Sequence, residues 1–217
     1  EQTLEGATLR VLKLMGRGTP SWASIDRTAR QQIETLATGP GLKGRCIRGL
    51  YSGGTLSYES LFILRYLGHQ VGSDAEAIPA GGDSVIDMGG DRYTVGRPHP
   101  MIDFRARCES LIQAAGDSEV GVVLLDVILG YGSHSDPASE LVPALLEAQA
   151  VAGYGGRRLD CVVALCGSPS DPQGLQQQQK ALTATGAVVA RSTAMAARIA
   201  SAISRTHPRI LPGGIFH

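Results

Sequence analysis

The feature that most constrains this 217-residue sequence is an alternation of short aliphatic runs with longer segments of helical periodicity. Such runs are typical of parallel strands that are covered by helices on both faces. Strands that alternate with helices are joined by right-handed crossovers and form a parallel sheet. The predicted strands are Cys46–Tyr51, Ser84–Met88, Val120–Ile128, Leu159–Leu165 and Ala187–Ala190.

These units predict a flavodoxin-like doubly wound α/β sheet of five mainly parallel strands, in the order 2-1-3-4-5, with helices on both faces. The segment Thr55–Leu67 is apolar nearly all round, so we expect a buried helix there. Pro143 is expected to kink or restart the helix that contains it. The predicted helices are Asp26–Ala37, Thr55–Leu67, Asp103–Ala115, Pro137–Ala150, Pro172–Thr185 and Thr193–Ser204.

The strand–helix pattern occupies only part of the chain. We expect residues 1–44 to form an N-terminal extension or linker with one helix, and residues 45–206 to form the flavodoxin-like domain. Residues 207–217 are rich in proline and glycine and are expected to be a C-terminal tail. Because the sequence opens with Glu1, we expect it to be part of a longer protein.

The composition excludes several classes of protein. The 20 Lys+Arg balance the 20 Asp+Glu and aromatic residues make up 5%, whereas nucleic-acid binders usually show a basic patch or stacking rings. No apolar run approaches the roughly 20 residues of a membrane span, and no signal peptide opens the sequence. Four irregularly spaced cysteines do not make a disulfide scaffold. We therefore expect a cytoplasmic globular domain that binds neither nucleic acid nor membrane.

The expected ligand site is the crevice at the carboxyl ends of the first and third predicted strands, where the strand order reverses. Two loops, residues 51–55 and 129–136, face this crevice and are rich in glycine and hydroxyl groups. Each leads into a helix N-terminus, whose unpaired N–H groups and dipole favour an anion. The candidate anion-binding residues are Ser52, Gly53, Gly54 and Thr55; the alternative is a tight turn with an ordinary cap.

A proline-stiffened loop presents Arg97 and His99 just before a predicted helix. Arginine matches a carboxylate or phosphate by bidentate contact, and histidine can transfer a proton near neutral pH. The alternative is that Arg97 pairs with Asp91 or Asp103 and that His99 is merely exposed.

The pattern S-x-S-D-P occurs twice, over residues 133–137 and 168–172. Aspartate as N-cap with proline at the first helical position is a strong helix-start signal, which explains Asp136 and Asp171. Helix capping explains the presence of His134 in the first of these segments less completely than it explains the two aspartates.

Other motifs in the sequence do not lie in the structural context that their usual binding function requires. The G-x-G-x-x-G string over residues 39–44 precedes a strand, whereas the dinucleotide fingerprint follows one. The dispersed histidines give no metal site. Cys161 and Cys166 fit small apolar fillers of a strand.

Several of these loops resemble the FdrA family of acyl-CoA synthetase-like proteins, over about Arg45 to Ser204. More distantly, the same stretch is similar to the C-terminal domain of the succinyl-CoA ligase β subunit. In that domain a strand, a glycine turn and a buried helix form half of a site for a phosphorylated histidine. The strings that carry the resemblance are R-G-L-Y-S-G-G-T-L (48–56), D-M-G-G-D (87–91), V-G-R-P-H-P-M-I-D (95–103) and L-L-D-V-I-L-G-Y-G (124–132).

The resemblance implies a ligase-type domain that binds a phosphate or acyl phosphate at Ser52–Thr55 during acyl or phosphoryl transfer. It places Gly130 and Gly132 near the acyl substrate, as the family's glycine pair. Arg97 would supply positive charge there, and His99 or His134 would donate a proton. Preorganised backbone donors, not a covalent nucleophile, would stabilise the developing charge.

The sequence shows no segment that resembles an ATP-grasp domain, a CoA-binding domain or a phosphohistidine loop. We therefore expect an α-like CoA-binding domain as partner, in cis or in trans, and a homo-oligomer. CoA and a nucleotide would bind elsewhere in the full assembly, and no cofactor is expected to bind tightly to this chain, which alone should be inactive. The alternatives are a subunit of a carbamoyltransferase complex of allantoin and oxamate metabolism, and a non-catalytic assembly domain.

Overall fold

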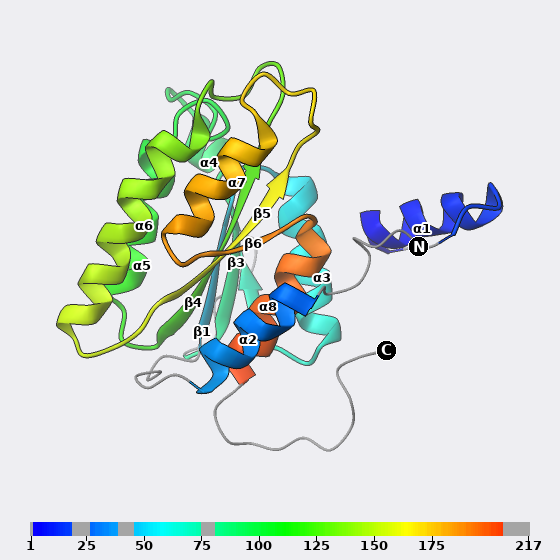
Figure 1. Ribbon diagram of the computed structural model, residues 1–217. Coiled ribbons are helices and arrows are strands. Elements are labelled where there is room, and N and C mark those ends of the chain that lie inside the picture. The colour runs from blue at the N-terminus through cyan, green and yellow to red at the C-terminus, as the bar shows by residue number, and fades with distance from the viewer. Residues whose placement is uncertain (1, 19–26, 39–45, 75–80, 206–217) are drawn as a thin grey trace.

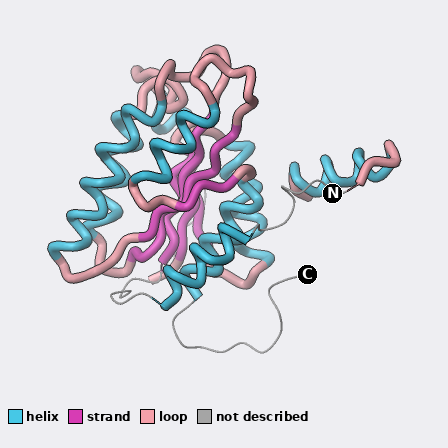
Figure 2. The backbone as a smooth tube through the Cα atoms, in the orientation of Figure 1, coloured by secondary structure: helices cyan, strands magenta, loops and turns pink. Residues whose placement is uncertain are grey.

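The computed structural model describes residues 2–18, 27–38, 46–74 and 81–205. Its centre is a six-stranded sheet in the order β2-β3-β1-β4-β5-β6, in which every pair of neighbours is parallel. Helices lie on both faces of the sheet (Figures 1 and 2). The strands are β1 Cys46–Tyr51, β2 Val71–Ser73, β3 Asp83–Asp87, β4 Val120–Ile128, β5 Asp160–Cys166 and β6 Val188–Ala190.

The helices form two layers, with α2, α3 and α8 over one face of the sheet and α5, α6 and α7 over the other (Figure 1). Alternate side chains of β4 enter the two cores, because successive residues of a strand point to opposite faces. Val122 and Leu124 belong to the α3–α8 side, and Val123 and Leu125 to the α5–α6 side. The helices are α1 Leu4–Leu14, α2 Arg27–Thr38, α3 Gly54–Tyr66, α4 Asp91–Thr94, α5 Arg105–Gly116, α6 Pro137–Tyr154, α7 Leu175–Ala184 and α8 Thr193–Arg205.

The predicted doubly wound α/β class is confirmed, with one strand more than predicted. The five predicted strands correspond to β1, β3, β4, β5 and β6, and they occupy the predicted order 2-1-3-4-5. The additional strand, β2, pairs in parallel with β3 at the edge of the sheet. It has only three residues, Val71–Ser73, which is too short to leave a periodic signal in a glycine-rich segment.

The second S-x-S-D-P segment does not begin a helix, so that prediction is wrong. Asp171 accepts the amide N–H of Ser168 at 2.6 Å and closes a turn. Helix α7 begins three residues after Pro172, at Leu175. Its N-cap residue is Gly174, whose φ of 72° lies in the left-handed region that favours glycine.

The first S-x-S-D-P segment does begin a helix, but Asp136 does not cap it with its side chain. The buried Gln178 of α7 fills that role, because its Oε1 accepts the amide N–H of Ala138 at 2.8 Å. Its Nε2 donates to Asp136 Oδ1 at 2.9 Å. Helix α6 then continues through Pro143 to Tyr154 and does not restart there.

The N-terminal region contains α1, which was not predicted, and α2, which was. The first turn of α1 is bound to the domain: the Glu5 amide donates to Glu59 Oε1 at 3.2 Å, and the Glu5 carboxylate pairs with Arg198 at 2.6 Å. Burial is the main cause that raises the pKa of Glu59. The G-x-G-x-x-G string and the predicted C-terminal tail lie outside the described residues.

No helix in the described ranges is long and apolar enough to cross a membrane.

Candidate functional site

The candidate site lies at the carboxyl edge of the sheet, where β1 leads through Ser52 and Gly53 into α3. Gly53 is the N-cap residue, its backbone is extended, and no side chain caps the helix. The first backbone bond of the helix runs from the Ser57 amide to the Gly53 carbonyl at 3.3 Å. Within the described part of the chain, the amides of Gly54, Thr55 and Leu56 therefore have no acceptor. Three aligned N–H groups at a helix start can bind an anion.

Burial distinguishes α3 from α7, which also begins without a side-chain cap. Helix α3 buries six residues of its length, including Ser57, Leu61 and Leu64, whereas α7 buries only Gln178 and Leu182. The field of a buried helix is less screened by water. The start of α3 is thus the stronger candidate for an anion site.

Ser52 has no donor left for a ligand. Its amide donates to Asp126 Oδ1 at 2.8 Å, and its hydroxyl donates to Asp126 Oδ2 at 2.5 Å. Asp126 lies in β4 and is fully buried. Ser52 therefore holds the turn, and the donors of this segment that have no acceptor among the described residues are the amides of the three residues that follow Gly53.

Asp126 is paired with Arg107 of α5, which is equally buried. Arg107 Nη2 donates to Asp126 Oδ1 at 2.8 Å, to the Asp126 carbonyl at 2.5 Å and to the Leu50 carbonyl at 3.2 Å. The guanidinium carbon lies 5.2 Å from the centre of the Phe104 ring. The sequence analysis missed both residues. Their signals are an aspartate that interrupts the run Val120–Ile128 and an arginine on the apolar face of a helix.

The turn after β3 packs closely on the turn after β1. A Cβ atom at Gly89 would lie 2.4 Å from the Ser52 carbonyl oxygen and 2.9 Å from His99 Nε2, so no side chain fits there. A Cβ atom at Gly54 would meet only side-chain atoms, Asp87 Oδ2 at 3.0 Å and the Tyr58 ring at 3.5 Å. Asp87 Oδ1 accepts the Gly89 amide at 2.9 Å.

His99 thus lies beside the start of α3. Its Nδ1 accepts the Met101 amide at 3.3 Å, so Nε2 carries the proton of the neutral ring and faces the Gly89 turn. That nitrogen is the one that could donate a proton in this region.

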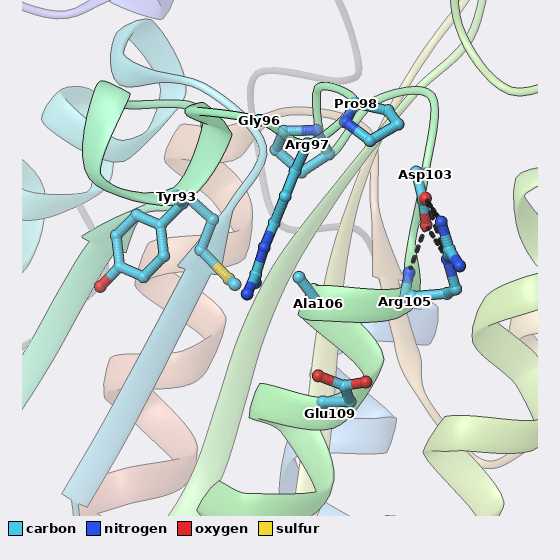
Figure 3. A pocket seen from close by; sticks show the side chains of 10 residues that line it. Tyr93, Gly96, Arg97, Pro98, Asp103, Arg105, Ala106 and Glu109 are labelled. Atoms are coloured by element: carbon cyan, nitrogen blue, oxygen red, sulfur yellow. Dashed lines mark hydrogen bonds and ion pairs between the residues drawn. The ribbon is translucent and has the colours of Figure 1, made fainter.

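Arg97 points into a neighbouring pocket of about 310 Å³, between Tyr93 and Ala106 and above Glu109 (Figure 3). It forms no ion pair with any described residue. The alternative pairing of Arg97 with Asp103 is wrong, because Arg105 occupies that carboxylate (2.5 Å). The hydrogen bonds from Arg105 lower the pKa of Asp103 to about 2. Arg97 remains available to an anion.

The loop after β4 is held by hydrogen bonds to the side chain of Gln173. Gln173 accepts the Gly130 amide at 3.0 Å and donates to the Gly130 carbonyl at 2.9 Å and to the His134 carbonyl at 3.1 Å. Gly130 and Gly132 both have positive φ, 119° and 88°. The Gly130 amide is therefore occupied, and the loop is held in one conformation by a residue that the sequence analysis did not single out.

His134 connects this loop to the loop that carries His99. Its amide donates to the Met101 carbonyl at 2.8 Å, and its Nδ1 accepts the Asp136 amide at 3.1 Å. Its ring meets Phe104 edge to face, with 5.8 Å between centroids. The structure thus gathers all the predicted site residues at one edge of the sheet, but Arg97 and His134 lie on its α5 side, away from α3.

A larger pocket, about 770 Å³, flanks the start of α3 on the other side. Leu56 and Glu59 of α3, Cys166 at the end of β5 and Thr193 of α8 contribute to its walls. Burial and the nearby Asp126 raise the pKa of the Cys166 thiol to about 11, against the opposing effect of Thr193. This thiol is therefore protonated at neutral pH and is a poor nucleophile. Among the described residues, no group of three or more His, Cys, Asp or Glu could hold a metal ion.

Comparison with known proteins identifies relatives of this chain. Residues 50–203 match the model of the CoA-ligase family. The chain is also 36% identical over 156 residues to the Uncharacterized protein YahF of Escherichia coli (strain K12). That match covers 68% of this chain but only 30% of YahF, so the chain spans under a third of the length of this relative.

Proposed function

Because the chain belongs to the CoA-ligase family, we propose that the start of α3 is the phosphate-binding site of a ligase-type domain in an FdrA-like acyl-CoA synthetase. The observation that carries the proposal is the set of amides of Gly54, Thr55 and Leu56, which no described group accepts. They open a helix that buries six of its residues, so their partial positive charge is screened less than at the start of a surface helix. We call these three amides the α3 cradle. It would hold a phosphate or acyl phosphate while the acyl or phosphoryl group is transferred.

The residues around the cradle have distinct roles in this proposal. Gly53 and Gly54 let the anion approach the backbone, and the exposed Thr55 adds a hydroxyl donor. Arg97 supplies a positive charge for the carboxylate or acyl end. His99 or His134 donates a proton. Donors that are already oriented stabilise charge as it develops in the transition state, which is the main source of rate enhancement in such a site.

The loop Gly130–His134 would close over the acyl or carboxylate end of the substrate. Its two glycines provide the positive φ angles that the turn needs, and Gln173 fixes its shape. Since the Gly130 amide is occupied by Gln173, Gly132 and the His134 ring are the groups of this loop that would meet the substrate.

The chain corresponds to 30% of YahF, so the remaining parts of the reaction are assigned to other domains. CoA and a nucleotide would bind there, and an α-like CoA-binding domain, in cis or in trans, would complete the site in a homo-oligomeric assembly. Carbamoyl transfer would use the same cradle, because carbamoyl phosphate presents the same phosphate group. Comparing the rates at which the full assembly turns over an acyl phosphate and carbamoyl phosphate distinguishes acyl transfer from carbamoyl transfer.

Titration of the ¹⁵N-labelled chain with inorganic phosphate tests the cradle. The amide resonances of Gly54, Thr55 and Leu56 should shift and saturate, because phosphate accepts hydrogen bonds from them. Gly54→Val should abolish the shifts while the domain stays folded, since a Cβ atom there meets only side-chain atoms of Asp87 and Tyr58. Gly153→Val is the matched control, because a Cβ atom at Gly153 meets nothing within 4 Å. Unshifted cradle amides in the wild type would refute the proposal.

A docking role is the second candidate function, and exposed apolar side chains favour it. Tyr131 is 95% exposed, Val95 81% and Ile102 52%, and all three lie on loops at the carboxyl edge of the sheet. A pure assembly domain would use these residues to bind a partner and would have no affinity for phosphate. The phosphate titration therefore separates the two functions.

A further inference from the structure

A buried ion pair lies directly beneath the start of α3. Arg107 is 1% exposed and Asp126 is 0% exposed, and their charged groups are 2.8 Å apart. Removing two charges from water is costly, and apolar residues of similar size often give a more stable protein. An ion pair kept at this position therefore calls for a role besides filling the core.

The hydrogen bonds of the pair point to that role. Asp126 accepts both the amide and the hydroxyl of Ser52, at 2.8 Å and 2.5 Å. Two bonds to one carboxylate fix the backbone and the side chain of Ser52 together. Ser52 immediately precedes Gly53, the N-cap of α3, so its orientation sets the direction of the amides that follow. We propose that Asp126 is a positioning residue that aims the α3 cradle, and that Arg107 supports it by cancelling its charge.

Charge cancellation matters because an isolated carboxylate beside the cradle would repel a phosphate. Arg107 lies against the same Asp126 oxygen that accepts the Ser52 amide. Ser52 thus donates two strong hydrogen bonds to a carboxylate whose own charge is balanced by Arg107. All three bonds of Arg107 come from Nη2, and its buried Nε has no partner among the described residues. Among the described residues, the guanidinium therefore donates only to Asp126 and to the Leu50 carbonyl.

This inference rests on the proposed function, because aiming the cradle matters only if an anion binds there. The test uses the full ¹⁵N-labelled chain and sulfate as the probe, because the charge of sulfate is constant near neutral pH. Two quantities are measured for each variant: amide hydrogen exchange at Ser52 and Gly53 without anion, and sulfate affinity from the cradle resonances. The first quantity does not depend on any ligand.

Ser52→Ala is the central variant, since it removes one bond to Asp126 and leaves the ion pair intact. We expect faster exchange at Ser52 and Gly53 and roughly tenfold weaker sulfate binding, the equivalent of one hydrogen bond to a charged group. Ser84→Ala is the matched control. Ser84 is also 1% exposed, but its hydroxyl has no partner in the described part of the chain. It should behave as the wild type in both measurements.

Arg107→Met and Arg107→Lys test the charge. Methionine leaves Asp126 unbalanced and should weaken sulfate binding by more than tenfold, whereas lysine keeps the charge and should restore most of the affinity. If Arg107→Met does not fold, Ser52→Ala and Arg107→Lys decide the question.

Wild-type exchange rates and affinity in Ser52→Ala would overturn the positioning role, as would equal changes in Ser84→Ala. If the wild type binds neither sulfate nor phosphate, the proposed function fails. Faster exchange in Ser52→Ala alone would then still support a turn that is positioned by Asp126.

Discussion

The two glycine-rich loops at the carboxyl edge of the sheet look alike in sequence, but the structure treats them in opposite ways. The turn before α3 leaves the amides of Gly54, Thr55 and Leu56 without an acceptor in the described chain. The loop before α6 is closed, since Gln178 accepts the Ala138 amide and Gln173 accepts the Gly130 amide. Glycine and serine make a loop able to bind an anion, but the side chains that reach the loop from elsewhere decide whether its amides stay open.

At two other helix starts on the same edge, a nearby side chain accepts a backbone amide. Ser192 Oγ accepts the Met195 amide of α8 at 3.1 Å, and Asp103 Oδ1 accepts the Arg105 amide of α5 at 3.0 Å. A capped start stabilises the helix, whereas an open start leaves its amides for a ligand. The contrast between α3 and these helices can be tested by disturbing each start in turn.

The largest loss of stability is expected for a substitution at Gly89, which lies where the turn after β3 packs against the turn before α3. Gly89→Ala would place a Cβ atom 2.4 Å from the Ser52 carbonyl oxygen, a backbone atom that cannot move aside easily. We expect a loss of about 3 kcal/mol in the free energy of unfolding, together with loss of phosphate binding. Urea unfolding and the phosphate titration measure the two.

Gly90→Ala is the control for this variant. Its Cβ atom would lie 3.4 Å from the Asp87 carbonyl, an ordinary contact, and its φ of −70° suits any residue. Equal stability of the two alanine variants would contradict the close packing of the turns.

The second effect concerns the closed start of α6. Gln178→Leu keeps the volume of the side chain but leaves the Ala138 amide and the Asp136 carboxylate without their partner. Since buried groups that lose a hydrogen bond cost about 1–3 kcal/mol, we expect a decrease of about 2 kcal/mol in the free energy of unfolding. Gln177→Leu, on the exposed face of the same helix, should change it little. If both variants were equally stable, the glutamine cap would contribute nothing.

The third largest loss of stability is expected when the side-chain cap of α8 is removed. Ser192→Ala removes the acceptor of the Met195 amide at the start of α8, which should lower the free energy of unfolding by about 1 kcal/mol. The exposed Ser135 provides the control substitution to alanine. An unchanged urea midpoint for Ser192→Ala would show that α8 does not depend on its cap.

The framework of this fold could be predicted from the sequence because it depends on local pattern. A run such as Val120–Ile128 is long and apolar enough to identify a buried parallel strand, and Asp136-Pro137 identifies a helix start. Strand β2 could not be predicted, since three residues carry no period. The dipeptide Asp171-Pro172 gave a wrong prediction of a helix start, because Asp171 instead closes a turn with Ser168.

The candidate site could be located from the sequence but not resolved into open and closed amides. The position of the turn at Ser52 follows from the end of a strand and a pair of glycines. Its partner Asp126 is 74 residues away, and Gln178 is 40 residues from the amide that it caps. Such partners depend on the strand order and on the helix packing, which local periodicity does not contain.

The smallest loss of stability is expected at the start of α5, where the carboxylate of Asp103 accepts the Arg105 amide. Hydrogen bonds from Arg105 lower the pKa of Asp103 to about 2 from its ordinary value of 3.8. A carboxylate with a lowered pKa stabilises the fold above its ordinary pKa, and this stabilisation is lost as the pH falls through 2. Arg105→Ala should therefore lower stability slightly at pH 7 and by a smaller amount near pH 2. The decrease should be smaller than that of Ser192→Ala because water screens an exposed ion pair. Urea unfolding of both proteins at the two pH values measures this difference. A decrease that is as large at pH 2 as at pH 7 would show that Arg105 acts through packing and not through the charge of Asp103.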